Sequence, residues 1–233
     1  MSGVLYGIGL GPGDAELMTL KAARLISAAQ VVAYPTLAGG SSFARSIAAD
    51  LIGDGVQEIV IDVPMKVERG PAQTAYDTAA DEISAILETG LDVIVLCEGD
   101  PFFYGSFMYI YARLKDRFQT EIVPGVTAMT ASAAALGLPL AARNEMLSVV
   151  PGPLPDDDLR QKISAADSVV IMKVGNHLGR IRAVIDGLGL LDQAHYIERA
   201  TLPAEQKMPL AKAPDPVPYF SMILITKEAD PWL

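Results

Sequence analysis

Short apolar runs alternate with helical patterns along the first half of the chain. Apolar runs predict strands over residues 4–10, 31–34, 57–63 and 92–97. After each strand, apolar positions recur at helical spacing, which predicts helices over residues 17–24, 43–51, 71–88 and 104–114. The continuously apolar last strand is typical of one covered on both faces. These strand-then-helix alternations favour an α/β sheet with mostly parallel strands.

The second half repeats this mixture less regularly. The pattern predicts strands over residues 120–123, 148–150, 169–172, 195–198 and 222–226, and helices over residues 126–136 and 176–188. Residues 151–158, rich in Pro and Asp, predict a loop, and the five prolines of residues 203–218 predict an extended loop or an edge excursion of the sheet. We therefore expect two α/β domains, residues 1–116 and 117–233.

Composition and charge narrow the function classes. The 233 residues are 51% hydrophobic, which is enough for a real core, and 18 Lys+Arg against 28 Asp+Glu give a net charge of −10. This balance disfavours a nucleic-acid binder, which needs basic side chains against phosphates, and a membrane-surface role. No apolar run approaches a bilayer span, and the first residues lack a signal-peptide pattern. We expect a cytoplasmic protein.

Metal and thiol chemistry find little support in the sequence. Cys97 is the single cysteine, and with only His177 and His195 beside it no cluster at metal-ligand spacing exists. A cysteine that ends an apolar run is typical of a buried small hydrophobe, although a thiol nucleophile with a distant His stays formally open.

The first candidate motif is a glycine-rich loop at residues 7–14 (GIGLGPGD), between a predicted strand and a predicted helix. The dinucleotide-binding spacing Gly-x-Gly-x-x-Gly fails in both registers, because Pro12 and Asp14 stand where glycine is needed. Pro12 also lacks an amide donor, and the Asp14 carboxylate would repel a phosphate. The loop therefore predicts either a structural turn or a tight turn over an uncharged or cationic group.

Two further turns follow predicted strands. Residues 97–105 (CEGDPFFYG) stand at the carboxyl end of the most apolar strand, where ligands of open α/β sheets bind. Glu98 and Asp100 are there either as a catalytic carboxylate pair or with Asp100 as a cap of the next helix. Residues 123–131 (VPGVTAMTA) lead into a helix of small residues. Its free amides and the Thr127 hydroxyl suit a carboxylate or an adenine edge, or serve packing alone.

Taken together, the three loops closely resemble the motifs of the tetrapyrrole methyltransferase family, the S-adenosylmethionine-dependent enzymes of cobalamin and siroheme synthesis. The resemblance covers essentially the whole chain and includes residues 17–23 (LMTLKAA). Within the family, Tyr34-Pro35 and residues 97–109 (CEGDPFFYGSFMY) are similar to the branch that methylates precorrin-2 at C(20). Glu98, where the commoner family form has Gly, is a feature of this branch.

The resemblance implies a homodimer of two-domain chains, with cofactor and substrate in the cleft between the domains and a fold unlike the usual Rossmann-like methyltransferases. S-adenosylmethionine would be the co-substrate, and no metal is implied. Carried over position by position, the cofactor contacts would be Pro12, Glu98, Gly99, Asp100, Phe103, Thr127, Ala128, Met172 and Ala200. Asp100 and Glu98 are also the candidates, by location, for the base that removes the displaced proton.

The implied substrate, precorrin-2, carries many carboxylates, so basic residues should line its site. The candidates are Lys21, Lys66, Arg69, Arg113, Arg143, Lys173, Arg180 and Lys207. Arg143 and Lys173 are preferred because they lie near the ends of predicted strands or loops. Other hypotheses stay open: methylation of the cobalt-chelated substrate of the anaerobic route, a methylase of the same fold with another substrate, and a non-catalytic tetrapyrrole-binding protein.

Overall fold

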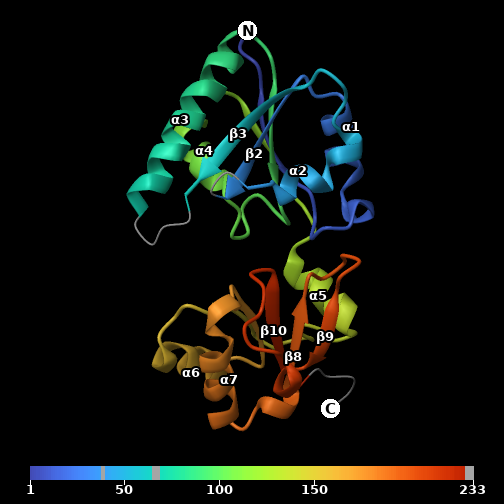
Figure 1. Cartoon of the computed structure of the whole chain (residues 1–233), viewed down its shortest axis with the longest axis vertical. Helices are drawn as coiled ribbons and strands as arrows, with labels where there is room; N and C mark the ends of the chain where they lie inside the picture. The colour runs from blue at the N-terminus through green and yellow to red at the C-terminus, as the bar shows by residue number, and fades with distance from the viewer. Residues whose placement is uncertain (38–39, 65–68, 229–233) are drawn as a thin grey trace. The chain divides into compact units, whose positions relative to one another are not determined.

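The chain divides into two compact units, Met1–Thr127 and Ala128–Leu233 (Figure 1). A computed structural model describes residues 1–37, 40–64 and 69–228, the side chains of Leu37 and Arg69 excepted. The sequence analysis placed the division between residues 116 and 117. The structure puts it later, because β5 (Thr120–Val123) pairs in parallel with β1 (Leu5–Gly9) and so belongs to the first sheet.

The first unit is built on a five-stranded parallel sheet in the order β3-β2-β4-β1-β5. Its remaining strands are β2 (Val31–Leu37), β3 (Gln57–Val63) and β4 (Val93–Cys97). Its helices are α1 (Leu20–Ser27), α2 (Phe43–Ile47), α3 (Arg69–Glu88) and α4 (Phe107–Leu114). The predicted parallel α/β arrangement is confirmed.

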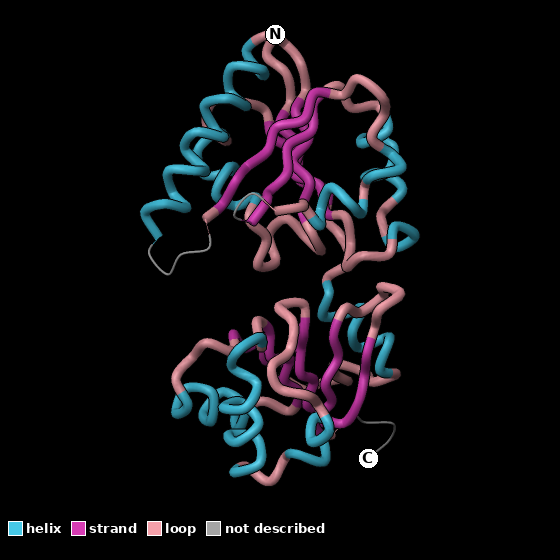
Figure 2. Tube along the Cα trace, viewed as in Figure 1, coloured by secondary structure: helices cyan, strands magenta, loops and turns pink. Residues whose placement is uncertain are grey.

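Helices cover both faces of this sheet, with α1 and α2 on one side and α3 and α4 on the other (Figures 1 and 2). The strand β4 shows why its sequence is apolar throughout. Val93, Val95 and Cys97 pack toward α3 and α4, whereas Ile94 and Leu96 pack toward α1 and α2. A strand buried on both faces needs an uninterrupted apolar run.

The neighbouring strands β1 and β4 are followed by connections that leave in opposite directions. The chain passes from β1 through α1 to β2, and from β4 through α4 to β5, on the far side of β1. Such a reversal opens a crevice at the carboxyl ends of the two strands, where ligands of open α/β sheets bind. The first two motif loops lie at this point, because residues 10–14 follow β1 and residues 98–105 follow β4.

The second unit contains a mixed five-stranded sheet in the order β6-β7-β10-β8-β9. Its strands are β6 (Leu147–Pro151), β7 (Ser168–Met172), β8 (Ala194–Glu198), β9 (Gln206–Pro209) and β10 (Ser221–Thr226). β6 and β7 run parallel, and the other pairings are antiparallel. The helices α6 (Asp156–Ala165) and α7 (Leu178–Gly187) pack on one face, and α5 (Ala128–Leu136) packs on the other.

Two helices depart from the sequence prediction. No helix was predicted at α6, because the prolines of residues 151–158 indicated a loop. The helix begins directly after Pro155, and three Asp residues in its first turn favour a helix N-terminus. The helix α4 begins at Phe107 rather than at Tyr104, whose left-handed φ of 56° cannot continue into a right-handed helix. The expected edge excursion is confirmed, since β9 is an edge strand paired with β8.

Candidate functional site

Backbone atoms of the three glycine motifs meet at the crevice of the first sheet. Gly11 and Gly99 form an isolated antiparallel bridge, with amide-to-carbonyl distances of 3.2 and 2.7 Å. A Cβ atom on Gly9 would lie 2.6 Å from the Gly125 amide nitrogen, and one on Gly125 would clash with the Gly99 carbonyl oxygen. Only glycine permits such close approach of three segments. The close contact of these backbones accounts for the glycines, so a phosphate-binding role is not needed to explain them.

The Asp100 carboxylate links the second motif loop to the third. Its Oδ1 accepts hydrogen bonds from the Phe102 and Phe103 amides, at 2.9 and 3.1 Å, and so fixes the turn after β4. Its Oδ2 accepts a hydrogen bond from the Gly125 amide at 3.1 Å. Asp100 therefore clamps the two loops together in the first unit.

Glu98 has a different environment, although it is only two residues away. It is the first residue after β4 and is half-buried. Burial raises the pKa of its carboxyl group, and the amides of Glu98 itself and of Ala44, in α2, partly oppose this by stabilising the charged form. A carboxyl group with a raised pKa, at the end of a central strand, is suited to accept a proton.

The remaining residues of the first motif shape the turn into α1. Asp14 caps the short 3-10 helix Ala15–Leu17, because its carboxylate accepts a hydrogen bond from the Glu16 amide at 2.9 Å. Pro12 is half-buried, and its two neighbours in the sequence, Gly11 and Gly13, both have positive φ angles.

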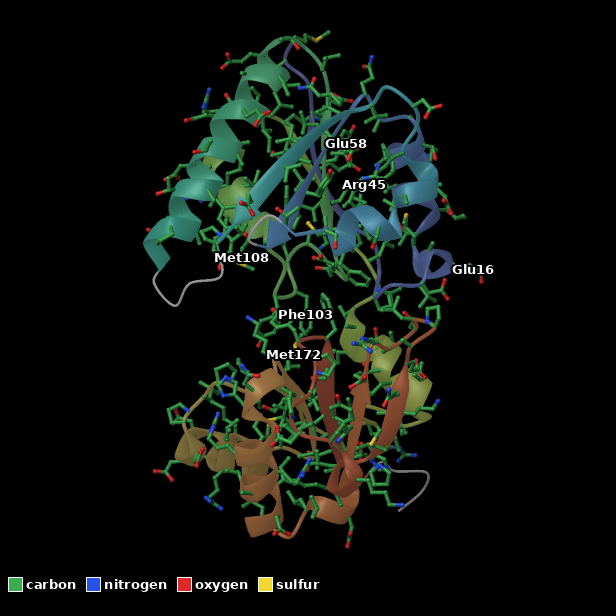
Figure 3. The ribbon with its side chains drawn as sticks, in the orientation of Figure 1. Glu16, Arg45, Glu58, Phe103, Met108 and Met172 are labelled. Carbon is green, nitrogen blue, oxygen red and sulfur yellow. The ribbon has the colours of Figure 1, made fainter. Side chains whose placement is uncertain are left out.

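Aromatic side chains occupy the second motif loop. Phe103, a predicted cofactor contact labelled in Figure 3, is half-buried. Its ring meets that of Tyr104 edge-on, with the ring centroids 5.2 Å apart. Tyr104 is 43% exposed and has a φ of 56°. Non-glycine residues with such backbone angles concentrate at binding and catalytic sites. The sequence pattern holds no signal for this strain.

In the second unit, three predicted cofactor contacts meet in one apolar cluster. Ala128 begins α5, Met172 ends β7, and Ala200 follows β8. All three pack against a core composed of Ala133, Val170, Ile197, Met222 and Leu224, which we call the α5 cluster. Thr127, the last residue of the first unit, directly precedes α5. Segments far apart in the sequence thus pack around one apolar core.

Several basic residues predicted to bind a carboxylate-rich ligand have acidic partners within their own unit. These pairs are Lys21 with Glu121, Arg113 with Asp77, Arg180 with Asp156, and Lys207 with Glu205. Lys66 and the side chain of Arg69 lie outside the described residues. The two preferred residues, Arg143 and Lys173, are exposed. The sequence analysis missed Arg199, which follows β8 directly and adjoins Ala200.

Thiol and metal chemistry remain without structural support. Cys97 is buried, and burial raises the pKa of its thiol, which disfavours the nucleophilic thiolate. Across residues 1–37, 40–64 and 69–228, no group of three or more His, Cys, Asp or Glu residues could hold a metal ion. Within the same part of the chain, no helix is long and apolar enough to cross a membrane.

Comparisons with known proteins place these loops in a family. The sequence profile described as Tetrapyrrole (Corrin/Porphyrin) Methylases matches residues 4–214. The chain is 40% identical to the precorrin-2 C(20)-methyltransferase of a Sinorhizobium species, over 97% of each chain. It is 32% identical to the cobalt-precorrin-2 C(20)-methyltransferase of Salmonella typhimurium, over 98% of each.

One further relative is longer than this chain, and a solved structure has the same fold as this chain. The chain is 40% identical to the cobalamin biosynthesis protein CobIJ of Mycobacterium tuberculosis, over 96% of this chain but only 46% of that protein, so it spans about half the length of this relative. The crystal structure of uroporphyrin-III C-methyl transferase from Thermus thermophilus, complexed with S-adenosyl homocysteine, has the same fold. The TM-score is 0.69 at 24% identity, over 97% of this chain and 92% of that one. The profile match, the relatives and the shared fold together establish that the chain belongs to the tetrapyrrole (corrin/porphyrin) methylase family.

Proposed function

We propose that this chain is an S-adenosylmethionine-dependent methyltransferase that methylates precorrin-2 at C(20) to give precorrin-3A in cobalamin biosynthesis. The observation that carries the proposal is the junction of three motif loops at the point where the first sheet reverses its connections. Two near-full-length relatives named C(20)-methyltransferases support the position of methylation.

The predicted cofactor contacts suit S-adenosylmethionine by their chemistry. In the first unit, the glycine junction brings backbone atoms of the motif loops together beside Pro12, Gly99 and Phe103. In the second unit, Ala128, Met172 and Ala200 are partly buried apolar residues packed against the α5 cluster, and such residues suit the adenosine and thioether parts of the molecule. When bound, this co-substrate supplies a methyl group on a sulfonium, which transfers to carbon as the carbon–sulfur bond breaks.

We assign different roles to the two carboxylates of the second motif. Asp100, whose two oxygens accept three amide hydrogen bonds, is a positioning residue that holds the second and third loops in place. Glu98, half-buried and with a raised pKa, is the candidate base. C(20) of the substrate loses its proton when it gains the methyl group, and the Glu98 carboxylate is proposed to take up that proton.

Positioning accounts for most of the expected rate. The meso carbon at C(20) is already electron-rich, so a site that aligns it with the methyl group and excludes water lowers the barrier without a metal. The rigid glycine junction and the Asp100 clamp supply such alignment in the first unit, because they fix the loops through backbone contacts.

A second candidate substrate is the cobalt-chelated macrocycle of the anaerobic route, which would be methylated at the same carbon. The match to the Salmonella relative named cobalt-precorrin-2 C(20)-methyltransferase favours it, although at 32% rather than 40% identity. A non-catalytic tetrapyrrole-binding protein is the remaining alternative. Our expectations of a homodimer and of a cytoplasmic location stay predictions, and light scattering of the purified protein tests the first.

The test is incubation of the purified protein with S-adenosylmethionine and either precorrin-2 or cobalt-sirohydrochlorin, followed by mass and carbon-13 analysis. One added methyl group at C(20) of the metal-free substrate supports the proposal. Methylation of the cobalt form alone moves the chain to the anaerobic route. Tetrapyrrole binding without methylation identifies a binding protein, and no binding or methylation of either substrate refutes the assignment.

A further inference from the structure

Among the described residues of the second unit, three cationic ones, Arg143, Lys173 and Arg199, have a left-handed backbone, and the last two directly follow strands. Lys173, directly after β7, has a φ of 57°, and Arg199, directly after β8, has a φ of 49°. Both are exposed, and each adjoins a predicted cofactor contact, Met172 or Ala200. This left-handed region is strained for residues other than glycine, asparagine and aspartate, and strain of this kind points to function.

The sheet places these two residues at the same edge. Both β7 and β8 pair with β10, which runs antiparallel between them. Ile171 pairs with Ile223, and Glu198 pairs with Ser221, so both strands end beside the start of β10. Two strand spacings, about 10 Å, therefore separate the backbones at this edge.

Buried groups hold Arg199 at its position. Its amide donates to the Phe220 carbonyl oxygen at 2.9 Å, and its Nη1 lies 3.5 Å from Oε1 of Glu198. Glu198 is only 5% exposed, and its Oε2 accepts a hydrogen bond from the Tyr196 hydroxyl at 2.5 Å. A buried carboxylate that is itself hydrogen-bonded gives the guanidinium a fixed anchor while its side chain stays open to solvent.

Partly buried apolar side chains adjoin both cations. Met172 and Ala200, the neighbours of Lys173 and Arg199, pack against the buried α5 cluster and remain partly open to solvent. Apolar side chains bordered by two cations complement a ligand with a flat apolar body and carboxylates at its rim. Because the chain has a net charge of −10, such a ligand needs local cations of this kind.

We infer that Lys173 and Arg199 bind carboxylate side chains of the tetrapyrrole substrate, which rests on the proposed function. The carboxylate of the co-substrate's methionine moiety has the same chemistry, so the test must distinguish the two. Lys173→Asn and Arg199→Asn remove the cation while keeping a residue that tolerates the left-handed region. Lys212→Asn is the control, because Lys212 is also exposed but lies in the turn after β9, whose end lies beside the start of β8 and so at the opposite edge of the sheet.

The experiment measures the affinities of the wild-type protein and the three variants for sirohydrochlorin by absorbance titration, and for S-adenosylhomocysteine by calorimetry. We expect sirohydrochlorin to bind roughly 5-fold more weakly to each of the two variants, as for an exposed ion pair, with less difference at high salt. The affinity of every variant for S-adenosylhomocysteine, and the affinity of Lys212→Asn for sirohydrochlorin, should be unchanged.

Three results would overturn the inference. Unchanged sirohydrochlorin affinity removes the proposed contact, and an equal loss in Lys212→Asn shows a general charge effect. A loss confined to S-adenosylhomocysteine affinity assigns the two cations to the carboxylate of the co-substrate. A wild-type protein that binds sirohydrochlorin but does not methylate precorrin-2 refutes the proposed function and leaves this inference standing.

Discussion

The Asp100→Asn variant tests whether this residue clamps the motif loops. An asparagine has one oxygen where the aspartate has two, and the structure uses both. If the side-chain oxygen stays with Phe102 and Phe103, the new NH2 group faces the Gly125 amide, and two donors oppose each other. The loss of one charge-assisted hydrogen bond at a half-buried site should destabilise the first unit by about 2 kcal/mol.

The measurement is amide hydrogen exchange, because the loops open locally and the chain has two units that need not unfold together. Exchange at Gly125 should accelerate about 30-fold, the factor that corresponds to roughly 2 kcal/mol. S-adenosylhomocysteine affinity should fall as well, because the second and third loops lose their fixed arrangement.

The matched control is Asp92→Asn in the same unit. Asp92 accepts one hydrogen bond, from the Val4 amide at 2.7 Å, and an asparagine oxygen can keep that bond after the same change in charge. Gly125 exchange in this control should match the wild-type protein. Unchanged exchange at Gly125 in Asp100→Asn would refute the clamp, and equal acceleration in the control would show that charge, not geometry, is responsible.

Three further predictions concern separate parts of the chain. Burial raises the folded-state pKa of Glu98, so the native carboxyl holds its proton to higher pH than the unfolded one, and its contribution to stability falls as pH rises from the unfolded pKa through the folded one. Glu98→Gln should therefore raise the thermal midpoint at pH 7 but not below pH about 4. In the same variant, the methylation rate should no longer increase with pH. An unchanged pH–rate profile excludes Glu98 as the base. Gly125→Ala should destabilise the first unit by about 1–3 kcal/mol in chemical denaturation, because its Cβ meets backbone, whereas Gly70→Ala, with open space around its Cβ, should not. Lys227→Met should lower the stability of the second unit by about 1 kcal/mol, because the Nζ of Lys227 donates to three carbonyl oxygens at the end of α6. The control is Lys162→Met, at an exposed lysine in the last turn of the same helix, which should change the stability less.

The elements predicted well are those whose apolar pattern ends at a clear breaker. The strands β3 and β5 coincide with their predicted ranges, because polar or glycine and proline residues flank a short apolar run. The sequence analysis missed the helix α6 because prolines that precede a helix and prolines of a loop give the same sequence pattern. Its start signal, three Asp residues after Pro155, is visible only if that proline is taken as a boundary rather than as a breaker.

The candidate site residues of the first unit lie in motifs whose glycine and aspartate positions the structure explains. Glycines whose backbones approach closely, and an aspartate that accepts three amide hydrogen bonds, leave strict spacings in the sequence. The same spacings could not separate Glu98 from Asp100, since the different roles that we propose for them depend on burial and on which amides face them. Those facing amides belong to α2 and to the third motif loop, which are distant in the sequence.

The second unit shows the opposite case. Its proposed ligand surface consists of small apolar side chains and strand ends, and such residues occur throughout the chain, so no spacing distinguishes Ala128, Met172 or Ala200. Arg199 is equally inconspicuous, because a single arginine after a strand is most often a solvated side chain. What distinguishes it is its left-handed backbone together with a buried carboxylate partner, and neither property follows from residue order. If Arg199→Asn weakens tetrapyrrole binding while Lys212→Asn does not, backbone strain in a folded chain will have identified a binding residue that the sequence pattern leaves hidden.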